Sequence, residues 1–152
     1  MPDESRSSPR EIQNYLSRIS GPLLDRIDLH IEVPPMKFGE ITSERTGEMS
    51  AQIGERVVAA RQRQQVRFQD KPKITCNARM GSREIKSHCV LDDATMELLK
   101  FAMSDLNLTA RAYDRVLKVA RTIAALAGAE TIASEHISEA IQYRSLDRQL
   151  WT

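Results

Sequence analysis

The sequence predicts a mainly α-helical protein, in which a helical bundle follows a remnant strand and helix of another kind of fold. Apolar residues recur every three or four positions over the second half of the chain, which is typical of helices with one buried face. Residues 27–33 instead alternate between apolar and polar side chains, the period of a half-buried strand. A content of 41% hydrophobic and 28% charged residues indicates a globular chain rather than a disordered one.

The amino-terminal segment contains the elements that do not belong to the bundle. A short helix is predicted from Pro9 to Ile19, because proline favours the first turn of a helix, and Gly21–Pro22 interrupts it. The strand at 27–33 follows and ends at Pro34–Pro35. A lone strand cannot satisfy its own backbone hydrogen bonds, so it needs partner strands that the sequence barely contains. We therefore expect the chain to be a piece of a longer protein.

The bundle begins with a long helix after a linker loop. The segment 37–48 is predicted to be that loop, and the helix is expected from about Ser50 to Phe68. A connector at 77–81, a short helix at 82–89 and a further helix at 92–104 follow. The residues expected to form the apolar edges of the two longer helices are Met49, Ile53, Val57, Ala60, Met96, Leu99 and Met103.

Residues 109–128 carry the clearest helical pattern. Thr109 is a favourable N-cap, a broad apolar stripe follows, and Gly128 is placed to end the helix. The basic residues opposite the stripe are Arg111, Arg115 and Lys118. Ser134 is then expected to cap a last helix. The residues that this last helix buries should be Ile137, Ala140 and Ile141.

Basic charge is concentrated on two segments, although the net charge of the chain is only +1. Between Glu55 and Lys73, six basic residues outnumber two acidic ones, and between Leu108 and Arg121 four outnumber one. Such stripes can line a subunit boundary or contact the phosphates of DNA, whereas many charged stripes are solvated faces without a partner. The sequence leaves these alternatives open.

Other classes of protein are not indicated. No apolar run approaches the roughly 20 residues that span a bilayer, and no leader for export is recognisable, so we expect a cytoplasmic protein without membrane contact. Cys76 and Cys89 form no CxxC pair and are expected as free, largely buried thiols. His30, His88 and His136 are too scattered to complete a metal site, and none is expected.

Two arginines are the candidate functional residues. Arg26 stands directly before the predicted strand, where a rigid edge would hold its guanidinium toward a phosphate of a neighbouring molecule. The alternative is a surface salt bridge with Asp25 or Asp28. Arg111 is the second residue of its helix, where a cation opposes the helix dipole at a cost of roughly 0.3–1 kcal/mol. An anion such as phosphate would offset that cost, and the alternative is a contact with Asp105.

The usual motifs for binding and cleaving a nucleotide are missing from the sequence. There is no GxxxxGK[ST] string, since none of the six glycines precedes a lysine. No predicted strand ends in paired acids that could hold magnesium. We therefore expect that this chain does not hydrolyse ATP by itself.

Three strings resemble, in order, the carboxy-terminal portion of the magnesium-chelatase-like AAA+ ATPases, of the competence-associated ComM and YifB type. They are YLSRISGPLLDRIDLHIEVP at 15–34, LTARAYDRVLKVARTIAALAG at 108–128 and EHISEAIQYRSLDR at 135–148. The resemblance implies a remnant of the α/β ATPase core at 1–36, with an arginine-finger segment. It also implies a linker loop at 37–48 and a helical lid-type domain at 49–152.

The resemblance also implies a role for each arginine. Arg26, in LLDRID, matches the arginine finger that reaches the γ-phosphate across a subunit boundary, and Asp25 matches the acid beside it. Arg111, in TARAYDR, matches the sensor-2 arginine, which contacts the γ-phosphate from the lid of the same subunit. The full-length protein would bind ATP and magnesium and form a homo-oligomeric, hexameric ring. This chain alone would bind neither and would be a monomer.

The implied function is to couple ATP hydrolysis in the ring to remodelling of DNA, by branch migration or helicase action in natural transformation. Two alternatives remain open at this point. One is a metal-chelatase motor subunit that drives the insertion of magnesium into a porphyrin. The other is a helical interaction module without a part in ATP hydrolysis.

Overall fold

Five α-helices and one 3₁₀ turn make up the described part of the chain, which confirms the predicted mainly helical fold. The computed structural model describes residues 26–34 and 47–144, with the isolated positions 8, 10, 11, 14, 18 and 23. In chain order the elements are α4 (Ser50–Arg67), η2 (Asn77–Arg79), α5 (Ser82–His88), α6 (Asp93–Asp105), α7 (Ala110–Leu126) and α8 (Ser134–Gln142). The helix predicted from Pro9 to Ile19 lies largely outside the described residues.

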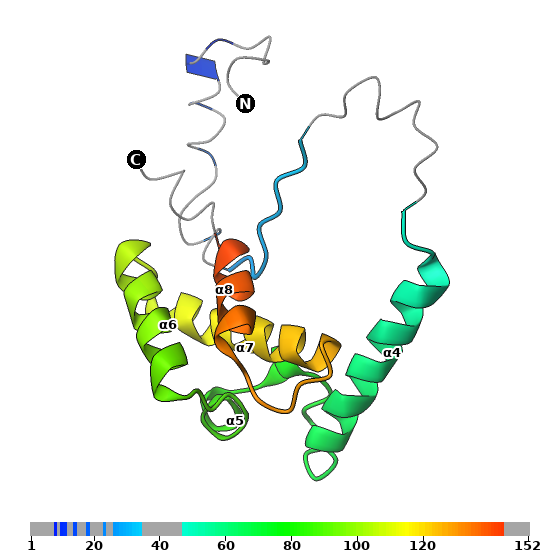
Figure 1. Cartoon of the computed structure of the whole chain (residues 1–152). Coiled ribbons are helices and arrows are strands. Elements are labelled where there is room, and N and C mark those ends of the chain that lie inside the picture. Colours follow the sequence, from blue (N-terminus) through cyan, green and yellow to red (C-terminus); the bar gives the residue numbers. More distant parts are fainter. Residues whose placement is uncertain are drawn as a thin grey trace.

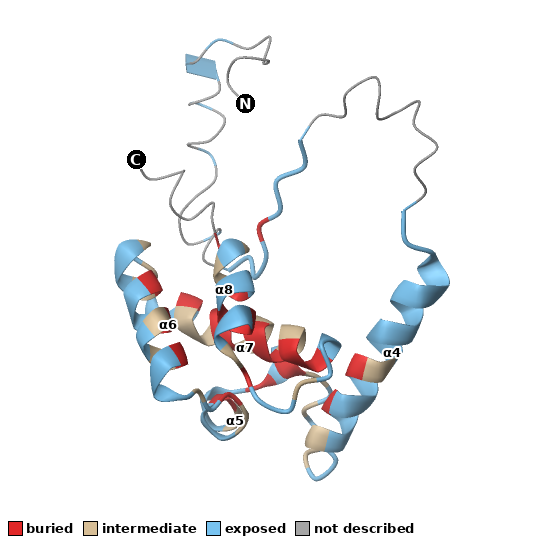
Figure 2. Ribbon diagram, in the orientation of Figure 1, coloured by how far each residue is buried: buried red, intermediate tan, exposed pale blue. Residues whose placement is uncertain are grey.

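Helix α7 is the centre of the bundle. It contacts α4, η2, α5 and α8, while α6 packs against α8 (Figure 1). Its ends form as the sequence predicts: Thr109 Oγ1 accepts a hydrogen bond from the Ala112 nitrogen at 3.2 Å, and Gly128 adopts a φ of 78° just after the helix. Buried residues gather on α7 and on the faces turned toward it (Figure 2). The buried residues of α7 are Ala112, Val116, Leu117, Ala120, Arg121, Ala124 and Ala125.

Helices α6 and α8 are both capped by side chains that the sequence analysis does not identify as caps. Asp92 Oδ1 accepts from the Thr95 nitrogen at 2.7 Å and so caps α6. Ser134 was expected to cap α8, but it is the first residue of the helix instead. The ring of His136 turns back, and its Nδ1 accepts from the Ala133 nitrogen at 2.9 Å. A buried imidazole thus satisfies the helix start in place of a hydroxyl.

The long helix predicted at 50–68 is confirmed as α4, but most of its predicted apolar edge is not buried. Met49, Ile53 and Val57 are 65%, 42% and 46% exposed, whereas Ala60 is 3% exposed. The reason is that α4 approaches α7 with its carboxy-terminal half and leads away from the bundle with its first turns (Figure 1). Its buried residues are Ala60 and Gln64.

The strand predicted at 27–33 does not form; residues 26–34 run along α7 and α8 without any strand partner in the described part of the chain. The predicted burial is also wrong, because His30 is 7% exposed while Ile31 and Val33 are 67% and 84% exposed. With no ladder available, the backbone of this segment is bound by the helices instead. The His30 nitrogen donates to the Tyr143 carbonyl at 2.8 Å, and Arg144 Nη1 donates to the Ile27 carbonyl.

Candidate functional site

Arg26 lies at the start of the described segment 26–34, and it is exposed. Its carbonyl accepts a hydrogen bond from Arg115 Nη1 at 2.8 Å, and its nitrogen donates to the Leu23 carbonyl at 3.0 Å. Asp28, which the sequence offered as a salt-bridge partner, pairs with Arg115 instead. Asp25 lies outside the described residues. The backbone at Arg26 is therefore fixed to α7 while the residue itself faces the surface.

Arg111 occupies the place that the sequence predicts, in the first turn of α7 and exposed. The hydroxyl of Thr109 caps the Ala112 nitrogen there, so the helix start that carries Arg111 is well defined. The other amide groups of this first turn have no partner inside the helix and add a partial positive charge. This arrangement can bind an oxyanion.

The two candidate arginines belong to the same part of the molecule. Arg115, whose guanidinium binds the carbonyl of Arg26, lies one helical turn after Arg111 on α7. A second clamp comes from Arg144, which is 1% exposed and binds the carbonyl of Ile27. Sequence reasoning missed the positioning roles of Arg115 and Arg144, because their partners are backbone atoms more than 80 residues away in the sequence.

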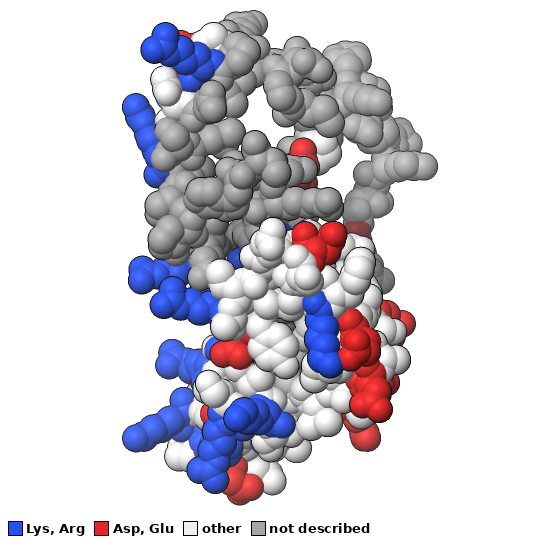
Figure 3. Space-filling model, turned by 90° about the vertical axis from the view of Figure 1, so that its left-hand side faces the viewer, with Lys and Arg blue, Asp and Glu red and all other residues white. Residues whose placement is uncertain are grey.

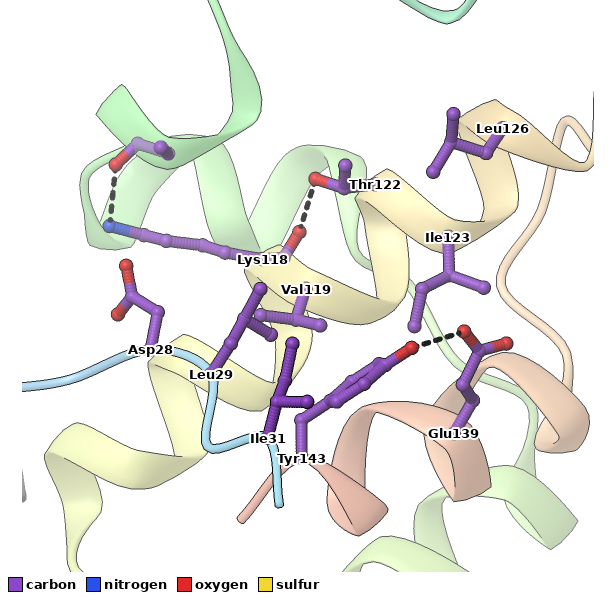
Figure 4. A pocket seen from close by; sticks show the side chains of 11 residues that line it. Asp28, Leu29, Ile31, Lys118, Val119, Thr122, Ile123, Leu126, Glu139 and Tyr143 are labelled. Carbon is purple, nitrogen blue, oxygen red and sulfur yellow. Dashed lines mark hydrogen bonds between the residues drawn. The ribbon is translucent and has the colours of Figure 1, made fainter. Parts of the chain in front are cut away.

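An apolar groove of about 310 Å³ separates the extended segment from α7 and α8 (Figure 4). Leu29 and Ile31 enter it from the segment, and Val119 and Ile123 from α7. Tyr143 closes it from the end of α8, where its hydroxyl donates to Glu139 Oε1 at 3.1 Å and this carboxylate raises the pKa of the phenol. Leu29 and Ile31, two of the four apolar residues that the predicted strand would have buried, thus line a groove that is open to the surface along its length.

A second pocket, of about 610 Å³, lies between α4 and α7 and is basic. Arg63 and Arg67 enter it from α4, and Arg121 from α7. Arg63 Nη1 donates to the Ala125 carbonyl at 3.0 Å, and Arg67 Nη1 donates to Asn77 Oδ1 at 2.9 Å. Burial lowers the pKa of both Arg67 and Arg121, because a charged guanidinium loses hydration there. The two basic stripes of the sequence thus meet in one place.

The residues of one basic stripe nevertheless have different partners. On α4, Arg56 forms a surface ion pair with Glu48 at 2.6 Å and takes no part in the pocket. On the face of the molecule that carries α6, Lys and Arg side chains gather along one edge and acidic ones along the other (Figure 3). Acidic and basic side chains therefore both occur on the described surface. The pocket differs from that surface because three arginines lie together in it, and the net charge of the chain does not show this.

The cysteines are free thiols, as predicted. Cys89 is buried and Cys76 is half-buried. Burial raises the pKa of the Cys89 thiol to about 11, which leaves it protonated and unreactive at neutral pH. The described residues contain no group of three His, Cys, Asp or Glu side chains placed to hold a metal ion. None of the helices in the described ranges has the length and apolar character that crossing a bilayer requires.

Two families match the chain, and both concern the same enzyme class. The family described as "Magnesium chelatase, subunit ChlI C-terminal" matches residues 47–144, and "Magnesium chelatase, subunit ChlI" matches residues 1–41. The first covers the whole helical bundle from α4 to α8. The second covers the segment that contains Arg26.

Curated relatives agree with these matches over nearly the whole chain. Competence protein ComM of Haemophilus influenzae is 45% identical over 148 residues, which cover 96% of this chain and 28% of ComM. The YifB proteins of Salmonella typhimurium and Escherichia coli are each 40% identical over 149 residues, covering 97% of this chain and 28% of YifB. The chain thus spans little more than a quarter of the length of these relatives.

Proposed function

Because this chain belongs to the magnesium-chelatase-like family of ComM and YifB, we propose that it is the finger and lid part of an AAA+ ATPase ring. The nucleotide-binding motifs absent from this sequence would lie in the rest of the protein, as would most of the ATP and Mg²⁺ contacts. In this arrangement the chain alone forms no complete ATPase site, and it contributes arginines to a site that other parts complete. We place the assembled protein, a hexameric ring, in the cytoplasm.

The observation that carries the proposal is the placement of the two arginines. Arg111 is exposed at the capped start of α7, where a cation opposes the helix dipole and an anion would offset both positive charges. Arg26 is exposed on a segment whose backbone Arg115 fixes to the same helix. A fixed backbone with an exposed guanidinium is what an arginine finger needs, because it stabilises charge on a transferred phosphoryl without first being ordered. In the proposed assembly, Arg26 with Asp25 acts across the subunit boundary and Arg111 acts as sensor 2 within its own subunit.

The substrate of the ring is proposed to be DNA. The name of the Haemophilus relative associates that protein with competence, and the family resemblance points to branch migration or helicase action during natural transformation. Two basic stripes on α4 and α7 are consistent with phosphate contacts. They consist of Arg56, Arg63 and Arg67 on α4 and of Arg115, Lys118 and Arg121 on α7. A ring of this kind should show ATP turnover that forked or single-stranded DNA stimulates.

The decisive experiment measures ATP turnover by mixed rings of the full-length protein. Wild-type subunits are mixed with increasing amounts of Arg26→Ala subunits. A finger that acts across the boundary silences the site of its neighbour, and its loss should lower turnover at that site by about 10³-fold or more. A control series uses Arg61→Ala, an exposed position on α4, and should leave turnover unchanged. If Arg26→Ala rings and Arg111→Ala rings both turn over ATP as fast as wild type, the proposal is wrong, and the alternative of a helical interaction module is supported.

A complementation experiment tests which subunit each arginine serves. Rings are assembled from equal amounts of Arg26→Ala and Arg111→Ala subunits, each of which is inactive alone. If Arg26 serves the neighbouring site and Arg111 its own, about a quarter of the interfaces regain both groups and turnover returns in part. If turnover does not return, both arginines of a subunit serve the same site, either its own or its neighbour's, and the assignment of one arginine to each site is wrong.

The family descriptions favour one alternative, a motor that drives magnesium into a porphyrin. This alternative predicts that a porphyrin together with Mg²⁺ stimulates turnover and that DNA has no effect. The same turnover assay with the two candidate substrates therefore separates the two functions.

A further inference from the structure

We propose that the basic pocket between α4 and α7 is a binding site for a phosphate group, formed by Arg63, Arg67 and Arg121. These are not the arginines assigned to ATP hydrolysis above, so the inference stands or falls separately from that assignment; its oligonucleotide probe also tests the DNA contacts proposed for the same helices. Its ligand chemistry is an oxyanion of a phosphate mono- or diester. The source of that phosphate, a free nucleotide or a nucleic-acid backbone, is for the experiment to distinguish.

The first argument is the state of Arg121. It is 5% exposed, and its Nε and Nη1 atoms are buried without any hydrogen-bond partner. A guanidinium buried in this way loses its hydration, which is costly unless a counter-ion offsets it. Protein carboxylates do not supply that counter-ion, because no ion pair of Arg121 occurs among the residues that the structure describes. The arrangement is therefore incomplete without an anion.

The second argument is that the neighbours of Arg121 add positive charge. Arg67 lies close enough that Arg121 helps to lower its pKa, and Arg63 lines the same pocket. The acidic residue in the lining is Glu130, one carboxylate against three guanidinium groups. Like charges are brought together at a cost in free energy, and binding an anion offsets that cost.

The third argument is that hydrogen bonds already hold two of the three guanidinium groups in place. Arg63 Nη1 binds the Ala125 carbonyl at the end of α7, and Arg67 Nη1 binds Asn77 Oδ1. Each of these hydrogen bonds uses one of the five N–H donors of its guanidinium, which leaves the others for a ligand. Gly128 lines the pocket as well, and a Cβ there would stand 3.2 Å from Arg63 Nη2. The glycine therefore makes room for the arginine fork.

Phosphate matches this pocket better than a single carboxylate does. Three guanidinium groups present several N–H pairs from two helices, and a phosphate group offers up to two negative charges on oxygens that point in different directions. The pocket volume of about 610 Å³ is large enough to hold a phosphate together with part of the molecule that carries it.

The test is calorimetric titration of the 152-residue chain with three probes at constant ionic strength: inorganic phosphate, ATP and a short single-stranded oligonucleotide. The variants are Arg121→Met and Arg67→Gln, and Arg61→Gln is the control on the same helix but outside the pocket. We expect saturable binding of at least one probe, unchanged in the control and about tenfold to a hundredfold weaker in each pocket variant. Arg121→Met should fold, because it removes a buried unpaired charge, and circular dichroism verifies this.

The probe that binds most tightly identifies the source of the phosphate. Tight binding of the oligonucleotide, with affinity that falls steeply as salt is added, assigns the pocket to a nucleic-acid backbone. Preference for ATP or inorganic phosphate assigns it to a small ligand. If the wild-type chain binds none of the three, or if Arg61→Gln weakens binding as much as Arg121→Met does, the proposal is wrong.

Discussion

Replacing Asn77 with alanine should destabilise the bundle more than its single side chain suggests. Asn77 is 1% exposed and joins three elements. Its Oδ1 accepts from Arg67 Nη1 of α4 at 2.9 Å, and its Nδ2 donates to Thr122 Oγ1 of α7 at 3.1 Å. Its backbone nitrogen, which survives the substitution, donates to Gln64 Oε1 at 2.9 Å. Asn77→Ala therefore removes two bonds that connect α4 to α7 through η2.

The size of the effect follows from these two bonds. A buried hydrogen bond to a charged group contributes about 1.5–3 kcal/mol, and one between neutral groups about 0.5–1.5 kcal/mol. Together they predict a loss of roughly 3 kcal/mol in the free energy of unfolding. For a domain of about 100 residues, each kcal/mol corresponds to roughly 4–8 °C in Tm, so the melting temperature should fall by about 15 °C or more.

The assay is urea and thermal unfolding followed by circular dichroism at the helix band. Thr122→Val removes the neutral bond from Asn77 together with the bond that the Thr122 hydroxyl donates to the Lys118 carbonyl at 2.8 Å, and should cost about 1–2 kcal/mol. Gln69→Ala, at an exposed position after α4, is the matched control and should stay within about 0.5 kcal/mol of wild type. An Asn77→Ala variant as stable as this control would refute the reasoning, because Asn77 would then not connect the helices.

Two further predictions concern other parts of the bundle. Gly128→Ala should lower the free energy of unfolding by about 1 kcal/mol in urea, because Gly128 has a φ of 78° and its new Cβ would press on Arg63; unchanged stability would contradict this. For Cys89, burial raises the folded-state pKa from 9.0 to about 11, so the stabilisation is present below pH 9 and is lost as pH rises through about 11. Cys89→Ala should therefore flatten the fall in stability between these pH values, measured by urea unfolding, and an unchanged slope would show that another group causes it.

The bundle could be predicted from the sequence where local signals and periodicity agree. Thr109 is an N-cap residue whose side chain forms the expected bond, and most of the apolar stripe that begins after it is buried along α7. The cap, the apolar stripe and the terminal glycine all indicate the same 17-residue helix, so its bounds and its buried face could be predicted. The predicted cap of α8 at Ser134 was wrong, because a histidine at the third position of a helix is not a usual cap signal.

Residues 27–33 were mispredicted because alternation of side chains specifies a strand only when a partner strand is present. The sequence pattern describes the period of the side chains and carries no information on what the backbone will bind. In this chain the backbone from Arg26 to His30 is hydrogen-bonded to Arg115, Arg144 and the Tyr143 carbonyl instead. Ile31 therefore stays exposed while His30 is buried. In the proposed full-length protein, neighbouring strands of the ATPase core would compete with these helices for the same segment.

The basic pocket could not be predicted because Arg121 lies at the border of the stripe on α7. At 3.6 residues per turn it is rotated about 80° from Arg111, between the polar and the apolar face. A residue at such a border is buried only if another helix covers it, and α4 does so with its carboxy-terminal half. The neighbours that α4 brings there are arginines. Had they been acids, Arg121 would be an internal salt bridge; because they are bases, the contact between α4 and α7 creates an anion site that neither helix has alone.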